Sequence, residues 1–146
     1  MKEQEIFTKK ASEGYIVCQV GQCPLREQCL RWKVGEQMPD SVRYVTLVNP
    51  RLQGVGANGC PEFREARKVR FAKGMLGIFT GDMPRRVEPA VRQAIISQTC
   101  RTYYYEYRKG QRLIPPALQQ VICEAFRREG WSGEVKFDSY IEDYDW

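Results

Sequence analysis

The sequence predicts an α+β protein in which a small cysteine-rich, metal-stapled module with a short β-sheet packs on a three-helix C-terminal half. Two observations lead to this prediction. Four cysteines fall within the first 60 of the 146 residues, separated by intervals of four, five and thirty residues. In the second half, apolar residues recur at the three- and four-residue spacings of amphipathic helices. We therefore expect a four-cysteine module at residues 14–72, a helical region at residues 84–130 and an acidic aromatic tail at residues 131–146.

The first four cysteines form the expected metal site, which we assign to Cys18, Cys23, Cys29 and Cys60. No apolar segment of the signal-peptide kind follows Met1, so we expect a cytoplasmic protein whose thiols stay reduced. Because the sequence contains no histidine, four thiolates around a tetrahedral zinc ion are the simplest expected chemistry. An iron–sulfur cluster, which also accepts four cysteine ligands, is the alternative cofactor. Disulfides or free buried thiols remain a third interpretation.

The module needs a staple because the stretch from residue 14 to residue 63 has little apolar surface to bury. A structural zinc site contributes about 10–16 kcal/mol in apparent terms, compared with about 2–4 kcal/mol for a disulfide. Either would hold the module together, but only the metal fits a reducing compartment.

Within the module we expect strands at residues 14–17, 42–48 and 63–71. The second is the clearest, since it is rich in β-branched and aromatic residues. Pro24 suits the first turn of a helix that buries Cys29 on one side. The polar residues 1–13 are expected to be irregular. The tail combines acids with aromatic groups, which favours a packed edge strand over disorder.

Three helices are expected in the second half. They begin at Pro89, at Thr99 as N-cap, and at the pair Pro115-Pro116. The middle helix ends before Gly110. Its core face follows the i, i+3, i+4, i+7 pattern and consists of Cys100, Tyr103, Tyr104 and Tyr107. These tyrosines are therefore expected to be buried and not to stack on nucleic-acid bases.

Charge is distributed unevenly along the chain, whose net charge is +5. Residues 61–130 carry fourteen basic and seven acidic side chains, a balance of +7, whereas residues 131–146 carry one basic and five acidic, a balance of −4. This asymmetry indicates either a polyanionic partner or pairing between the two regions.

Residues 99–115 read as a polar cap, a basic aromatic helix and then Gly110-Gln-Arg-Leu-Ile-Pro115. This order resembles the recognition helix of repressor-type helix-turn-helix proteins. The resemblance implies a turn at Ser97-Gln98-Thr99 and DNA contacts from Arg101, Thr102, Tyr105, Arg108 and Lys109. Arginine can read guanine bidentately, and lysine or tyrosine can hold phosphates. The alternative is a small three-helix core with a solvated basic face.

Taken whole, the chain carries Cys23-Pro-Leu25, Cys29-Leu-Arg31, Val48-Asn-Pro50, Cys60-Pro-Glu-Phe63 and a closing Tyr144-Asp-Trp146. In these residues it resembles a family of short uncharacterised bacterial proteins that form a domain of unknown function. The resemblance implies no activity.

We expect a binding protein and not an enzyme. The sequence offers no histidine base, no nucleophile elbow and no glycine-rich phosphate loop. A metal held by four thiolates has no open position for water. DNA is the leading expected partner, which would make the protein a small regulator; an interaction or scaffold protein is the alternative, and an iron–sulfur redox or sensor protein comes third. No apolar run approaches the length of a membrane span, so no membrane partner is expected.

Overall fold

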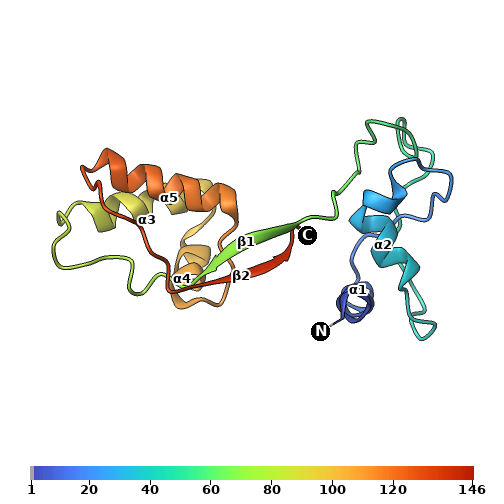
Figure 1. Ribbon diagram of the computed structural model, residues 1–146, viewed down its shortest axis with the longest axis horizontal. Coiled ribbons are helices and arrows are strands. Elements are labelled where there is room, and N and C mark those ends of the chain that lie inside the picture. Colours follow the sequence, from blue (N-terminus) through green and yellow to red (C-terminus); the bar gives the residue numbers. More distant parts are fainter. Residues whose placement is uncertain (1) are drawn as a thin grey trace. The chain divides into compact units, whose positions relative to one another are not determined.

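The computed structural model describes residues 2–146 and divides them into two compact units (Figure 1). Unit 1 comprises residues up to 67 together with Tyr144–Trp146, and unit 2 comprises Lys68–Asp143. The described residues form five α-helices and one two-stranded antiparallel sheet, which confirms the α+β class. In this part of the chain, no helix has both the length and the apolar character needed to cross a membrane.

Unit 1 contains helix α1 (Glu3–Ser12), a 3-10 turn η1 (Arg26–Gln28) and helix α2 (Leu30–Glu36). The expectation that residues 1–13 are irregular is wrong for the described residues. Phe7 and Ala11 lie one helical turn apart, so both can bury against the same core. Helix α1 contacts α2, and the buried core of the unit consists of Phe7, Ala11, Val17, Leu30, Val34 and Tyr144.

The C-terminal aromatic residues belong to this core. The ring of Tyr144 lies 5.2 Å from that of Phe7, and the ring of Trp146 lies 5.5 Å from that of Tyr15. Lys10 places its ammonium group 4.8 Å from the Trp146 ring. The last three residues therefore complete a hydrophobic cluster that begins in α1, more than 130 residues earlier in the chain.

The expected strands at residues 14–17 and 42–48 are wrong. One parallel bridge joins Val17 to Leu47, and the segment between residues 42 and 46 belongs to no strand. Tyr44 is 90% exposed. Strand propensity reflects the fit of a side chain to a half-buried pleated surface, and here no sheet supplies that surface.

The expected helix from Pro24 through Cys29 is also interrupted. Cys29 has an extended backbone (φ −102°, ψ 121°) and is the N-cap of α2. It forms an antiparallel bridge with Glu65, which takes its backbone out of the helical conformation. The hydrogen bonds on either side of it run from the Leu30 amide to the Arg64 carbonyl and from the Ala66 amide to the Gln28 carbonyl.

Unit 2 contains strand β1 (Lys68–Lys73), helices α3 (Val87–Gln98), α4 (Arg101–Lys109) and α5 (Pro116–Arg128), and strand β2 (Ser139–Tyr144), whose last residue is assigned to unit 1. The two strands pair with each other, so β1 comes from the expected module and β2 from the tail. The expectation of a strand in the tail is confirmed. The expected strand at residues 63–71 begins later, at Lys68.

Helices α3 and α5 pack against each other in the core of unit 2. Val91 and Ile95 of α3 and Ile122 and Phe126 of α5 are fully buried. Helix α4 ends as expected at Gly110, whose left-handed backbone (φ 73°) lies against Gly74, where an added Cβ would meet backbone atoms at 3.5 Å.

The core face expected for α4 is correct in part. Tyr104 and Tyr107 are buried, at 1% and 6% exposure, but Tyr103 is 38% exposed and lies beneath the guanidinium of Arg112, 3.7 Å from the ring centroid to the carbon atom. Cys100 is exposed and not in the core. It lies outside the helix as its N-cap, where its Sγ accepts a hydrogen bond from the Tyr103 amide.

Candidate metal centre

The four cysteines Cys18, Cys23, Cys29 and Cys60 line one cavity of about 20 Å³ in unit 1. A cavity needs roughly 10–15 Å³ of open space to hold one water molecule, so this cavity has room for about one. Cys29 is buried, and the other three are half-buried. Residues separated by up to 42 positions in the sequence are thereby brought to one place in the fold.

Backbone hydrogen bonds hold three of these cysteines, two of them within local turns and one to the start of α2. The Cys18 amide donates to the Arg31 carbonyl at 3.0 Å, the Cys23 amide to the Val20 carbonyl at 3.2 Å and the Cys29 amide to the Arg26 carbonyl at 3.1 Å. Cys60 begins a turn in which its own carbonyl accepts from the Phe63 amide. The thiols are therefore carried on backbone held by turns and by the start of α2.

The cavity wall is closely packed around the thiols. Gly56 has a positive φ of 81°, and a Cβ there would meet Val20 at 2.8 Å, so only glycine lets this loop approach. The indole nitrogen of Trp32 is buried without a hydrogen-bond partner among the described residues. Trp32 and Val20 both line the cavity.

The four thiols are not arranged around a common point as metal ligands would be. Within residues 2–146, no group of three or more His, Cys, Asp or Glu side chains is arranged to hold a metal ion. The four cysteines thus share a cavity without converging on one point. Sulfur ligands at the usual Zn–S distance of about 2.3 Å would require their side chains to turn inward.

The other two cysteines lie in unit 2. Cys100 caps α4, and Cys123 is half-buried on α5. Burial raises the pKa of the Cys123 thiol, and the nearby Arg127 guanidinium opposes this rise. Neither residue lines the four-thiol cavity.

The expected nucleic-acid contacts all lie on helix α4. The side chains at positions 101, 102, 105 and 109 are exposed, and Arg108 is half-buried, with a guanidinium nitrogen 3.8 Å from a Glu88 carboxylate oxygen. These positions share one side of the helix, opposite Tyr104 and Tyr107. Helices α3 and α4 are separate, because Thr99 leaves the helical conformation (φ −136°, ψ −113°) between them.

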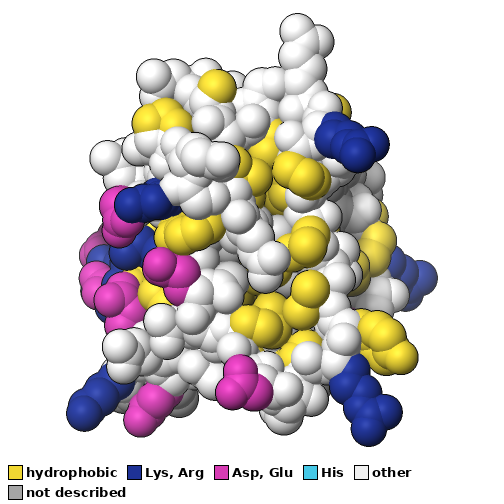
Figure 2. Space-filling model, turned by 90° about the vertical axis from the view of Figure 1, so that its right-hand side faces the viewer, with side chains coloured by type: hydrophobic (Ala, Val, Ile, Leu, Met, Phe, Trp, Pro, Cys, Tyr) yellow, Lys and Arg dark blue, Asp and Glu magenta, His cyan; other side chains and the backbone are white. Residues whose placement is uncertain are grey.

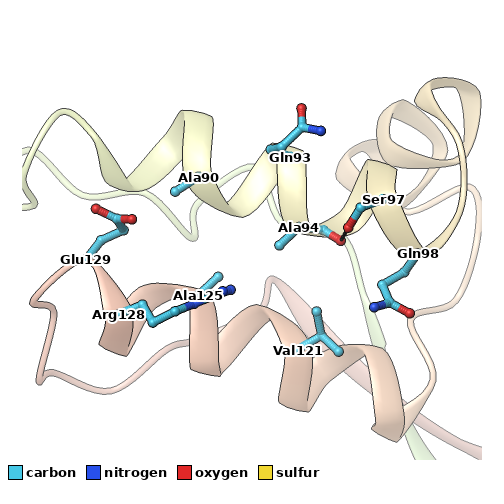
Figure 3. Close-up of a pocket in the computed structure, with 9 residues that line it drawn as sticks. All are labelled: Ala90, Gln93, Ala94, Ser97, Gln98, Val121, Ala125, Arg128 and Glu129. Carbon is cyan, nitrogen blue, oxygen red and sulfur yellow. Dashed lines mark hydrogen bonds between the residues drawn. The ribbon is translucent and has the colours of Figure 1, made fainter.

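A groove between α3 and α5, which we did not expect from the sequence, has a volume of about 400 Å³. Ala90 and Ala94 of α3 point toward Val121 and Ala125 of α5 across it (Figure 3). Arg128 extends along one side. The four-residue spacing of Ala90 and Ala94 was the signal available in the sequence, since small side chains one turn apart leave a helix surface hollow.

Hydrophobic side chains also reach the surface of unit 1. Tyr44 stands out at 90% exposure, and Ile16, Val45, Leu47 and Leu52 are all more than 40% exposed. Figure 2 shows hydrophobic side chains spread over one face of the molecule, with Lys and Arg side chains at its margins. Contiguous exposed apolar surface is typical of interaction sites, whereas single exposed apolar side chains are ordinary.

Comparison with known proteins gives one match to a family model, described as a family of unknown function (DUF6078), which covers residues 1–146. No curated protein and no solved structure matches the chain.

Proposed function

Because the chain belongs to this family of unknown function, whose description brings no activity with it, we propose a function from the chain's own residues. The protein is a metal-stabilised binding protein and not an enzyme. One zinc ion, held by the four thiols at positions 18, 23, 29 and 60, keeps unit 1 folded, and the basic side of α4 in unit 2 binds nucleic acid.

The observation that carries the metal part is that four thiols line one cavity of about 20 Å³. A volume near that of one water molecule suits a single ion and is too small for a cluster of several iron and sulfide ions. This favours zinc over an iron–sulfur cluster. The glycine at position 56 lets the loop approach Val20 closely, which fits a small site closed around the four thiols.

Elemental analysis of the freshly purified full-length protein, together with its absorption spectrum, tests this proposal. We expect one zinc per chain and no visible absorption, because Zn²⁺ has a filled d shell. A brown protein containing iron would replace the zinc assignment with the cluster. A metal-free protein with intact thiols would remove the metal from the proposal altogether.

The observation that supports nucleic acid is the exposed side of α4, which presents Arg101, Tyr105 and Lys109 together. Arg101 lies with its guanidinium carbon 6.0 Å from the Tyr105 ring, so both can contact one stretch of backbone or base edge. The surrounding residues 61–130 carry a charge of +7, which attracts a polyanion.

If about five phosphates are neutralised, the logarithm of DNA affinity should fall with the logarithm of salt concentration at a slope of roughly −4. Arg101→Ala should weaken binding by about 1–3 kcal/mol at a preferred site, whereas Lys109→Ala should weaken all sequences alike. Fluorescence anisotropy with labelled duplexes at several salt concentrations measures both. A salt-independent signal, or wild-type affinity in the Arg101 variant, would contradict this role for α4.

A protein partner is the second candidate, favoured by the exposed hydrophobic side chains of unit 1 and by the α3–α5 groove. The two candidates use different residues, so they can be separated. Tyr44→Ser should reduce binding to a protein partner and leave DNA binding unchanged, while Arg101→Ala should do the reverse.

A further inference from the structure

We propose that Arg31 is the positioning residue of the thiol site: its side chain and backbone tie three of the four cysteine-bearing segments together, so that their sulfurs can reach one metal ion. This inference rests on the proposed function, because it concerns the same cavity. It goes beyond that proposal by naming the residue that assembles the site.

Arg31 occupies an unusual position for a charged residue. It is 8% exposed, and among residues 2–146 it is the one polar or charged residue in the buried class. A buried guanidinium is costly unless its donors are used and its charge is paired. Arg31 meets this requirement, because its donors are used in hydrogen bonds and its charge is paired.

The guanidinium of Arg31 holds two other segments. Its Nη1 donates to the Ile16 carbonyl at 3.0 Å, and its Nε donates to the Glu62 carbonyl at 3.0 Å. Its Nη2 lies 3.4 Å from a Glu62 carboxylate oxygen. In the opposite direction, the Arg31 carbonyl accepts from the Cys18 amide at 3.0 Å.

These contacts coincide with the positions of the cysteines. Ile16 lies two residues before Cys18, Glu62 lies two residues after Cys60, and Arg31 itself lies two residues after Cys29. The planar fork of arginine can serve two carbonyls and a carboxylate at once, and an ammonium group cannot reproduce that geometry. Arg31 thus joins the Cys18, Cys29 and Cys60 segments through one side chain.

The fourth segment is held by a second arginine. Arg26 donates from its Nη1 to the carbonyl of Gly21, which lies between Cys18 and Cys23. Arg26 and Arg31 both line the cavity. Four thiolates around Zn²⁺ would carry a net charge of −2, and the two guanidinium groups, each also paired with a neighbouring carboxylate, lie in the wall around them. Partners of this kind, one layer outside the ligands, commonly change metal affinity 10- to 100-fold.

The test measures zinc and cobalt binding by full-length wild type, Arg31→Lys, Arg31→Met and Glu62→Gln, with a chromophoric zinc chelator as competitor. Arg43→Met is the matched control, because it removes the same charge from an exposed position of unit 1. We expect the dissociation constant for zinc to rise about 10- to 100-fold in Arg31→Lys and further in Arg31→Met. Glu62→Gln should show a smaller rise, and the control none.

The absorption spectrum of the cobalt-bound variants distinguishes a positioning role of Arg31 from a purely structural one. In Arg31→Lys we expect weaker sulfur-to-cobalt charge-transfer absorption per bound ion, because the Cys60 segment is no longer held in reach. Wild-type affinity and wild-type cobalt spectra in both Arg31→Lys and Glu62→Gln would overturn the inference while leaving the metal site intact. A wild-type protein that binds neither ion would overturn the metal site and the role of Arg31 together. Should Arg31→Met fail to fold, Arg31→Lys and Glu62→Gln decide the question.

Discussion

Replacing Cys60 with serine is expected to abolish stoichiometric metal binding and to unfold unit 1, while unit 2 stays folded. Cys60 is the proposed ligand farthest in sequence from the other three, and it lies in a loop that contains neither helix nor strand. A three-thiolate site loses most of its affinity, and structural zinc contributes about 10–16 kcal/mol to domains of this kind. Stabilities of whole domains are about 5–15 kcal/mol, so the loss should exceed what unit 1 can sustain.

Amide hydrogen exchange of the wild type and the variant, read separately for the two units, measures this effect. Exchange should accelerate across α1 and α2 and stay slow in α3 and α5. Cys100→Ser and Cys123→Ser are the controls, because both cysteines lie in unit 2 and neither lines the cavity. If Cys60→Ser keeps one zinc per chain and the exchange rates of the wild type, Cys60 is not a ligand.

Local signals predicted the helices of unit 2 well. Pro116 opens α5, Gly110 ends α4 with a left-handed backbone, and the apolar stripes of α3 and α5 face the core. These features depend on residues within a few positions of each other, and the sequence displays them directly. The four cysteines were likewise recognisable as a group, although their role as ligands is still a prediction.

The expectations that the structure contradicts depended on contacts between residues that lie far apart in the sequence. Residues 42–48 have the composition of a strand, yet among residues 2–146 no neighbouring strand pairs with them beyond the single bridge at Leu47. Tyr103 has the spacing of a core residue, but its ring lies at the surface, where the Arg112 guanidinium packs on it. Helix α1 looked too polar to fold, because the aromatic residues that cover Phe7 come from the far end of the chain.

The tail shows the same dependence most clearly, since it supplies β2 to unit 2 and two aromatic rings to unit 1. Asp138 anchors the tail just before β2: its two carboxylate oxygens each accept a hydrogen bond at 2.9 Å, from the Leu76 amide and the Gly77 amide. Asp145 lies with an oxygen 3.6 Å from the Arg67 guanidinium. These two acidic groups of the tail are therefore already engaged by residues of unit 2 and unit 1, respectively.

Deleting residues 139–146 is accordingly expected to destabilise both units. Unit 2 loses β2, the strand that pairs with β1. Unit 1 loses Tyr144, which is 4% exposed, and Trp146. Removing one buried aromatic side chain usually costs about 3–5 kcal/mol, which is a large part of the stability of a small domain.

Single substitutions divide this effect between the units. Tyr144→Ala should lower the unfolding free energy of unit 1 by about 3 kcal/mol, because its ring packs 5.2 Å from Phe7 and 5.5 Å from Trp146. Tyr140→Ala is the matched control, because this 38% exposed ring of the same strand contacts Arg70 and Phe137 of unit 2; it should leave unit 1 unchanged and cost unit 2 about 1 kcal/mol. Urea unfolding followed by tryptophan fluorescence in a Trp131→Phe background reports on unit 1 through Trp32 and Trp146, because Trp131 belongs to unit 2. Equal losses in the two variants would show that the buried ring of Tyr144 stabilises unit 1 no more than an exposed tyrosine does, which would contradict the role given to the aromatic cluster.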